Sequence, residues 1–257
     1  MSALRRLSRV AMLPTSPVLI VQGRRLRRDT PRLADAAQPW SGSVAGVDPL
    51  RLLVLGDSTA AGVGAATQDA ALPGNLAREL STRLGRGVEW RAVGENGATS
   101  RDLVERYLDA ATAAAADLVF LSVGANDALA LRSRSAFVRD IRTIITRLRA
   151  ASPASTILVS SLPGFSQFVL LPNPLRWNLY LHSTSLEDAA RATVSSFERV
   201  HMSPPPPKYT DGFFASDLFH PSESGYRDWA RFALDDAQAS GLLTPLAAVD
   251  RRGSPRG

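Results

Sequence analysis

Residues 52–58 read LLVLGDS, an apolar run that ends in a glycine, an aspartate and a serine. The apolar residues predict a short buried strand, and the small residues that follow predict a turn that leaves Ser58 accessible. Near the other end of the chain, residues 216–221 read SDLFHP and bring Asp217 within three residues of His220. A serine, an imidazole and a carboxylate are the nucleophile, the base and the orienting acid of serine hydrolases. These two stretches therefore predict a hydrolytic site.

Strand and helix patterns alternate along the chain from Leu50 onward. Apolar runs predict strands at residues 52–55, 88–93, 118–123, 156–160 and 200–202. Apolar residues at helical spacing predict helices at residues 75–84, 100–116, 133–152, 186–200 and 222–239. Strands joined by helices in this way imply right-handed crossovers and a parallel sheet covered on both faces. The expected fold class is α/β: a three-layer α/β/α domain with a five-stranded parallel sheet in flavodoxin-like order.

Three candidate residues come shortly after a predicted strand. Ser58 follows the first strand, Gly97 the second and Asn126 the third. The carboxyl ends of parallel strands lie along one edge of a sheet, and ligands of such sheets bind at that edge. The fold alone therefore predicts that these three residues converge.

The stretches that carry Ser58, Gly97, Asn126 and His220 occur in this order and resemble the SGNH (GDSL) hydrolase superfamily. The resemblance extends over roughly residues 50–239, most of the chain. It implies a serine esterase that hydrolyses acyl esters through an acyl-enzyme intermediate, with no metal and no organic cofactor.

The resemblance also implies a role for each residue. Ser58 would be the nucleophile, His220 the general base and Asp217 the carboxylate that orients the imidazole. Gly97 and Asn126 would form an oxyanion hole together with the backbone N–H of Ser58. Such a donor typically stabilises the transition state by about 3 kcal/mol.

Each candidate also has an ordinary structural interpretation. Taken alone, Ser58 is typical of a helix N-cap, Gly97 of a turn and Asp217 of a turn cap. The neighbouring acids Asp57 and Asp127 are expected to order the turns that carry the candidates. The presence of all the stretches together favours the catalytic interpretation.

A long segment at residues 163–182 is interrupted by prolines and rich in leucine and aromatic residues. We expect it to be a lid or the wall of an acyl pocket, which would favour apolar acyl chains as substrate. The expected substrate-binding residues are Phe165, Phe168, Trp177, Phe213 and Phe214. The alternative is that these side chains only pack over the sheet.

Other function classes remain open beside the esterase. A thioesterase or an acyltransferase would use the same residues with a different leaving group or acceptor. A non-catalytic, membrane-associated scaffold with a vestigial site is the second alternative. The chain has no G-x-S-x-G elbow, no P-loop and no cysteine, which argues against an α/β-hydrolase, a nucleotide site and a thiolate metal site.

Charge is unevenly distributed over the 257 residues, whose formal net charge is +6. Residues 1–32 hold eight arginines and one acid, whereas the middle of the chain is slightly acidic. A basic flank on an acidic domain argues against nucleic acid as a partner and leaves an anionic membrane surface open. The expected partner is therefore a small-molecule or lipid-like ester, with peripheral membrane contact through residues 1–32.

Three regions are expected along the chain: a basic arm and linker at 1–49, the hydrolase domain at 50–240, and a flexible tail at 241–257. The arm's apolar run at residues 10–21 is shorter than the ~20 residues that span a bilayer, and no cleavage site follows it closely. It would either wrap the domain, which its prolines favour, or lie at a membrane interface. We expect a cytoplasmic or peripherally membrane-associated protein rather than a secreted one.

Overall fold

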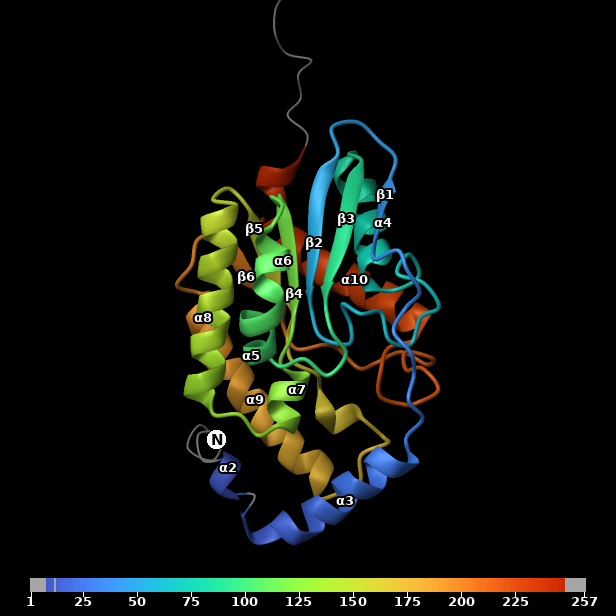
Figure 1. Cartoon of the computed structure of the whole chain (residues 1–257), viewed down its shortest axis with the longest axis vertical. Helices are drawn as coiled ribbons and strands as arrows, with labels where there is room; N and C mark the ends of the chain where they lie inside the picture. The colour runs from blue at the N-terminus through green and yellow to red at the C-terminus, as the bar shows by residue number, and fades with distance from the viewer. Residues whose placement is uncertain (1–7, 12, 248–257) are drawn as a thin grey trace, which may run out of the picture.

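The computed structural model describes residues 8–11 and 13–247. Its centre is a six-stranded sheet with the order β1-β3-β2-β4-β5-β6, and helices cover both faces (Figure 1). The strands are β1 (Ser41–Val44), β2 (Leu50–Gly56), β3 (Val88–Gly94), β4 (Leu118–Ser122), β5 (Thr156–Val159) and β6 (Val200–Met202). The three-layer α/β/α fold class is confirmed.

Strands β2 to β6 are the five expected parallel strands, and they lie in the order β3-β2-β4-β5-β6. When these five are numbered along the chain from β2, this is the flavodoxin-like order 2-1-3-4-5. The sixth strand, β1, lies in the segment expected to be a linker and pairs antiparallel with β3. Its sequence, SGSV, is exposed over three of four residues, so no apolar alternation marks it as a strand. Backbone pairing at the sheet edge, with Ser41 opposite Arg91 and Val44 opposite Val88, defines this strand instead.

Alternate residues of the buried strands pack into two apolar cores, one on each face of the sheet. Leu53 and Leu55 face the core covered by α5 (Ser100–Asp102), α6 (Leu108–Thr112), α8 (Arg134–Ala151) and α9 (Leu175–Val194). Leu52 and Val54 face the core covered by α4 (Leu72–Leu84) and α10 (Glu223–Ala239). Successive side chains of a strand point to opposite faces of the sheet, and here both faces are buried. These strands therefore appear in the sequence as continuous apolar runs.

Three helices differ from expectation at their starts. The helix expected from residue 75 begins at Leu72, three residues earlier. The helix expected from residue 186 begins at Leu175, so α9 takes up the second half of the segment expected to be a lid. The helix that Ser100 was expected to cap is capped by Thr99 instead. The Thr99 side chain accepts from the N–H of Asp102, and the Asp102 carboxylate accepts from the N–H of Thr99. It then continues through a π-helical turn, η2 (Leu103–Tyr107), into α6.

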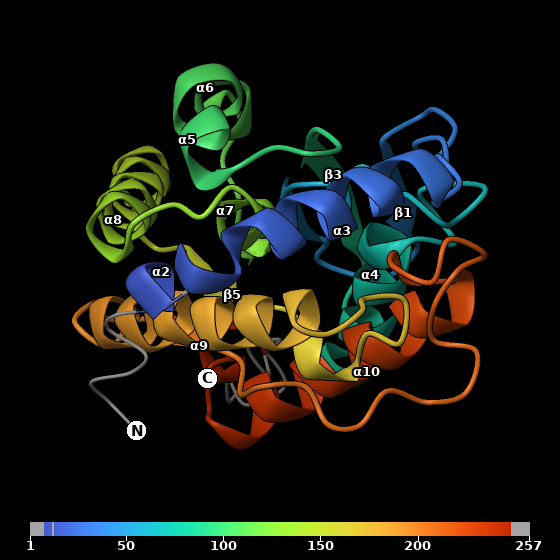
Figure 2. The same cartoon turned by 90° about the horizontal axis from the view of Figure 1, so that it is seen from below.

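The N-terminal arm lies against the domain. Helix α3 (Ser16–Asp29) crosses the end of the molecule at which the parallel strands finish, as Figure 2 shows. The side chain of Gln22 donates to the carbonyl of Asn173 (2.8 Å) and accepts from the N–H of Leu175 (3.1 Å), which fixes α3 to the start of α9. Farther along, the N–H of Ala36 donates to the carbonyl of Ala61 (2.9 Å).

The described part of the tail is packed. Leu243 and Leu246 are buried in the core beside α10, so residues 241–247 belong to the folded unit. Residues 248–257 of the tail, and residues 1–7 and 12 of the arm, lie outside the described residues. The three-region division stays a prediction. Within the described residues, no helix combines the length and the apolar character needed to cross a bilayer.

Candidate active site

Ser58 lies in the turn after β2 and is 7 % exposed. The turn is tied to the next strand because the N–H of Asp57 donates to the carbonyl of Ser122 (3.1 Å). It closes on itself because the N–H of Val63 donates to the carbonyl of Ser58 (3.0 Å). The serine is thus held at the carboxyl end of the sheet on a short, internally bonded turn.

Asp57 braces this turn, as expected. Its Oδ1 accepts from the N–H of Thr59 (3.1 Å), and the Thr59 hydroxyl lies 3.1 Å from the same oxygen and 2.8 Å from Ser122 Oγ. Burial raises the pKa of Asp57 to about 6, against the lowering effect of the Thr59 hydrogen bonds.

Asp217 and His220 form a hydrogen-bonded pair. His220 Nδ1 lies 2.6 Å from Asp217 Oδ2, and the N–H groups of Phe219 and His220 both donate to Asp217 Oδ1 at 3.0 Å. Leu218, between Asp217 and Phe219, has a φ of 55°, a left-handed conformation that turns the chain back on itself. Burial alone would raise the pKa of Asp217, but the bonds from His220 and the two N–H groups hold it below its ordinary value.

Ser58 and His220 both line one cavity of about 120 Å³ at the carboxyl edge of the sheet. Since Nδ1 of His220 is occupied by Asp217, its Nε2 is the nitrogen left to act on another group. The cavity is mostly apolar, and its aromatic lining is Phe168, Tyr209, Phe213, Phe214, Phe219, Trp229 and Phe232.

Gly97 lies in the turn after β3, and Asn126 lies in the short helix α7 (Ala125–Leu129). Both are outside the lining of this cavity, whereas Ala125, next to Asn126, is part of it. Gly97 has a φ of 88°, which favours glycine, and an added Cβ there would meet open space. Asn126 Nδ2 donates to the carbonyl of Ala98 (3.0 Å), which joins α7 to the turn after β3. The side-chain amide has two N–H donors, so this bond leaves the second one for another acceptor.

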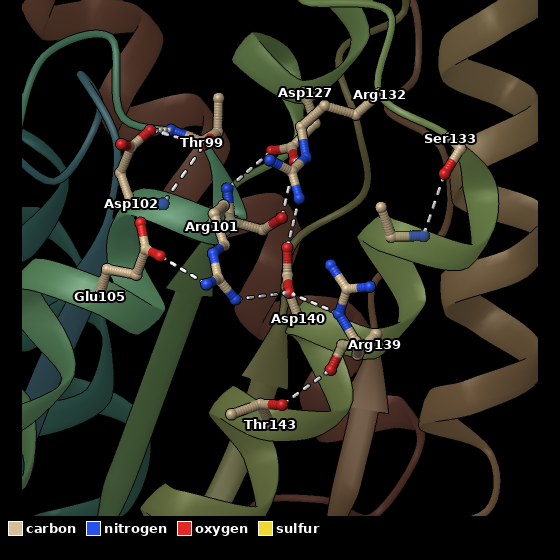
Figure 3. Close-up of polar contacts among 12 residues, drawn as sticks. Thr99, Arg101, Asp102, Glu105, Asp127, Arg132, Ser133, Arg139, Asp140 and Thr143 are labelled. Carbon is tan, nitrogen blue, oxygen red and sulfur yellow. Dashed lines mark hydrogen bonds and ion pairs between the residues drawn. The ribbon is translucent and has the colours of Figure 1, made fainter.

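Asp127, also in α7, is bonded to Ser100 at the start of α5. It is fully buried; its Oδ2 accepts from the N–H of Ser100 (2.9 Å) and its Oδ1 from the Ser100 hydroxyl (2.6 Å). Arg132 lies between Asp127 (Nε to Oδ1, 3.0 Å) and the buried Asp140 of α8, and Figure 3 shows this chain of charges. Burial raises the pKa of Asp127, with the Ser100 bonds and Arg132 acting against it. The predicted ordering role of Asp127 is thus an actual network.

The expected substrate-binding residues divide into two groups. Phe168, Phe213 and Phe214 line the cavity of Ser58 and His220. Phe165 instead lies fully buried in the core beneath Phe168, and Trp177, in the first turn of α9, is 55 % exposed and outside the cavity lining. The early start of α9 explains Trp177, because a helical turn directs that side chain to solvent.

Four aromatic residues in the lining were not among the expected substrate-binding residues: Tyr209, Phe219, Trp229 and Phe232. Trp229 and Phe232 are three residues apart and thus on one face of α10, a spacing visible in the sequence. Tyr209 follows the proline run at 204–207, and its hydroxyl accepts from the N–H of Gly164 (3.3 Å). Only the fold brings that loop over the cavity.

The other two histidines lie away from this cavity. His182 is buried and bonded to Ser8 Oγ (3.0 Å), and its burial lowers its pKa to about 4. His201 Nε2 lies 2.7 Å from Asp236 Oδ2. In the part of the chain that the structure describes, no group of three or more histidine or acidic side chains is arranged to hold a metal ion.

The chain is similar to known esterases in sequence and in fold. A GDSL-like esterase, Rv1075c, from Mycobacterium tuberculosis is 28 % identical over 218 residues, 79 % of this chain and 67 % of that protein. A family 3 carbohydrate esterase from Clostridium thermocellum superposes with a TM-score of 0.58 at 17 % identity, over 78 % of this chain and 100 % of that one. The psychrotrophic esterase EstA from Pseudoalteromonas gives 0.55 at 17 % identity, over 75 % and 98 %. At these identities the solved structures support the fold.

The family follows from a direct match. Residues 54–227, well over half of the chain, match the model of the GDSL-like Lipase/Acylhydrolase family. The matched span begins within β2 just before Ser58 and ends after His220, so it contains Ser58, Gly97, Asn126, Asp217 and His220. The chain therefore belongs to the GDSL-like lipase/acylhydrolase family and is an ester-hydrolysing enzyme.

Proposed function

We propose that the protein is a serine esterase that cleaves acyl esters through an acyl-enzyme intermediate on Ser58. The observation that carries this proposal is the pairing of His220 with Asp217 at the rim of the cavity that Ser58 lines. A bonded Nδ1 fixes the ring tautomer in which Nε2 is a base, which is what a serine hydroxyl needs to become a nucleophile.

In the acylation step, Ser58 Oγ attacks the ester carbonyl carbon while His220 Nε2 takes the hydroxyl proton. The carbonyl oxygen becomes an oxyanion. The backbone N–H groups of Ser58 and Gly97 and the second side-chain N–H of Asn126 stabilise it. The tetrahedral intermediate then breaks its bond to the alcohol oxygen, which leaves with the proton from His220. Water, deprotonated by His220, attacks the acyl-enzyme and releases the carboxylic acid and Ser58.

A fluorophosphonate probe tests this mechanism, since it labels serines that are activated as nucleophiles. We expect labelling of the wild type and of Ser161→Ala, a matched control because Ser161 lines the same cavity. We expect no labelling of Ser58→Ala. This variant should also lose ester hydrolysis while its melting temperature stays unchanged. A folded wild type that resists the probe, or equal labelling of Ser58→Ala, would contradict the proposal.

The apolar cavity wall favours an apolar acyl group in the substrate. Phe168, Phe213 and Phe214 pack edge to face in this wall, with ring centroids 4.9 to 5.2 Å apart. Thioesters would use the same residues, so the preferred leaving group is set by comparing oxygen and sulfur esters of one acyl chain. A thioester preferred more than tenfold would make the protein a thioesterase instead.

We further propose peripheral contact with an anionic membrane through α3. Val18 and Val21 are about half exposed, and Arg25 and Arg28 of the same helix are exposed beside them. Exposed apolar residues next to arginines suit a lipid surface, where guanidinium groups meet phosphates. Co-sedimentation with phosphatidylglycerol vesicles should exceed that with phosphatidylcholine and fall in Val18→Asn/Val21→Asn. A cytoplasmic or membrane-peripheral location remains the prediction that accompanies it.

A further inference from the structure

A second cavity, of about 500 Å³, lies beneath α3. It is four times as large as the cavity of Ser58 and falls within the roughly 300–1,000 Å³ of sites that hold whole small molecules. Its wall is mainly aliphatic and comes from α3, from the end of α7 (Ala125–Leu129) and the loop after it, and from the start of α9 and the segment before it. The apolar lining residues are Leu19, Ile20, Leu26, Leu129, Leu131, Leu170, Leu171, Leu175, Leu179 and Phe219.

The roof of this cavity belongs to a part of the chain outside the family match. Helix α3 ends at Asp29, whereas the matched span begins at residue 54. The two hydrogen bonds of Gln22 to the backbone of Asn173 and Leu175 hold the roof against α9. The cavity is therefore closed on one side by a segment that the family match does not include.

Two cations lie at the rim. Arg24 and Arg27 line the cavity, and no acidic residue is part of its lining. Among the described residues neither forms an ion pair, in contrast to Arg28 on the same helix, which pairs with Asp29 at 2.7 Å. An apolar interior with two guanidinium groups at its mouth is complementary to an alkyl chain that ends in an anionic group.

Phe219 connects the two cavities. Its ring lines both, and it directly precedes His220 in the chain. A molecule beneath α3 thus lies against the residue next to the candidate base. If the proposed esterase acts on long-chain acyl esters, the carboxylate that it releases has the two properties that the cavity selects for.

We propose that the cavity beneath α3 binds a long-chain fatty-acid anion, with its alkyl chain among the leucines and its carboxylate at Arg24 and Arg27. The choice of a carboxylate rests on the proposed function, whereas the presence of a binding site does not. Binding is therefore measured on Ser58→Ala, in which hydrolysis plays no part.

The experiment is calorimetric titration with oleate below its micelle concentration, at about 0.15 M salt so that distant charges are screened. In the Ser58→Ala background, Arg24→Gln/Arg27→Gln is compared with Arg25→Gln/Arg28→Gln. Both pairs remove two charges from one helix, but only the first pair lines the cavity. We expect the first to weaken oleate binding about tenfold and the second to leave it within twofold.

Two further ligands complete the test. Octanoate should bind on the order of 100-fold more weakly than oleate, because a shorter chain buries less apolar surface. An oleoyl lysophosphatidate should bind no more tightly than oleate; tighter binding would make the site one for lipid phosphates and overturn the fatty-acid assignment. Equal losses in the two arginine pairs, or no oleate binding at all, would overturn the site itself. None of these outcomes depends on the probe labelling of Ser58, so the two proposals fail separately.

Discussion

Asp217 and Asp127 are both buried carboxylates near the candidate site, but they are held in different ways. The bonds to Asp217 come from within three residues: the N–H groups of Phe219 and His220, and the His220 ring. Asp127 is instead bonded to Ser100, 27 residues away, and through Arg132 to Asp140 of α8. One carboxylate organises a single turn, and the other joins three separate helices, α7, α5 and α8.

The two environments move the pKa in opposite directions. At Asp217, hydrogen bonds to the ionised form outweigh burial and lower the pKa. At Asp127, burial outweighs the bonds from Ser100 and the charge of Arg132, with the charge of Asp140 adding to burial, and the pKa rises. We infer that Asp217 serves the chemistry of His220, whereas Asp127 serves the fold that carries Asn126.

The largest expected effect comes from Asp217→Asn. The amide still accepts from the N–H groups of Phe219 and His220, but it presents an N–H to the imidazole and favours the wrong tautomer. We expect kcat for an acyl ester to fall on the order of 10³- to 10⁴-fold with the fold retained. Asp236→Asn is the matched control, because Asp236 also lies 2.7 Å from a histidine, His201, away from the cavity. A loss below tenfold for Asp217→Asn would show that His220 works without its partner.

Asp127→Asn should act mainly on stability. Arg132 would lose a buried counter-ion and the Ser100 hydroxyl a charged acceptor, so we expect the free energy of unfolding to fall by about 3 kcal/mol. The kcat should change less than tenfold. The control is Asp109→Asn, which breaks an ion pair of similar length with Arg147 (2.7 Å) at an exposed site and should leave urea unfolding unchanged. A loss of activity with unchanged stability would reverse the roles of the two aspartates.

The same contrast explains what the sequence could predict. Asp217 and His220 were identifiable because their contact spans three residues, and the strands β2 and β4 because both faces are apolar. The network depends on how α5, α7 and α8 come together in space, which no local sequence pattern encodes. Its members are Asp127, Arg132 and Asp140. β1 was missed because its pairing uses backbone atoms, and the cavity beneath α3 because it forms only where the arm meets α9.

The pH dependence of stability should differ in sign between the two aspartates. Asp217, with a lowered pKa, adds stability that is present above its ordinary value of 3.8 and is lost as the pH falls below it. Asp127, with a raised pKa, makes the fold less stable as the pH rises above 3.8. Urea unfolding between pH 3 and 7 measures the free energy of unfolding of the wild type and of each asparagine variant. The quantity to compare is the wild-type value minus the variant value at each pH. The difference should rise with pH for Asp217→Asn and fall for Asp127→Asn, and equal slopes would contradict the assignment.

The smallest expected effect is that of Arg132→Lys, which keeps the charge but not the shape. A guanidinium can contact Asp127 through Nε and Asp140 through Nη2 at once, whereas a lysine has one ammonium group to place between two buried carboxylates. We expect a loss of about 1 kcal/mol in urea unfolding, because the charge remains and only one of the two contacts survives. Arg147→Lys, at the exposed pair with Asp109, should be neutral, since a single contact there needs no fork. If Arg132→Lys is also neutral, the network acts through its net charge alone. Asp127 would then join α7 to α5 through Ser100, and the link to α8 would add little.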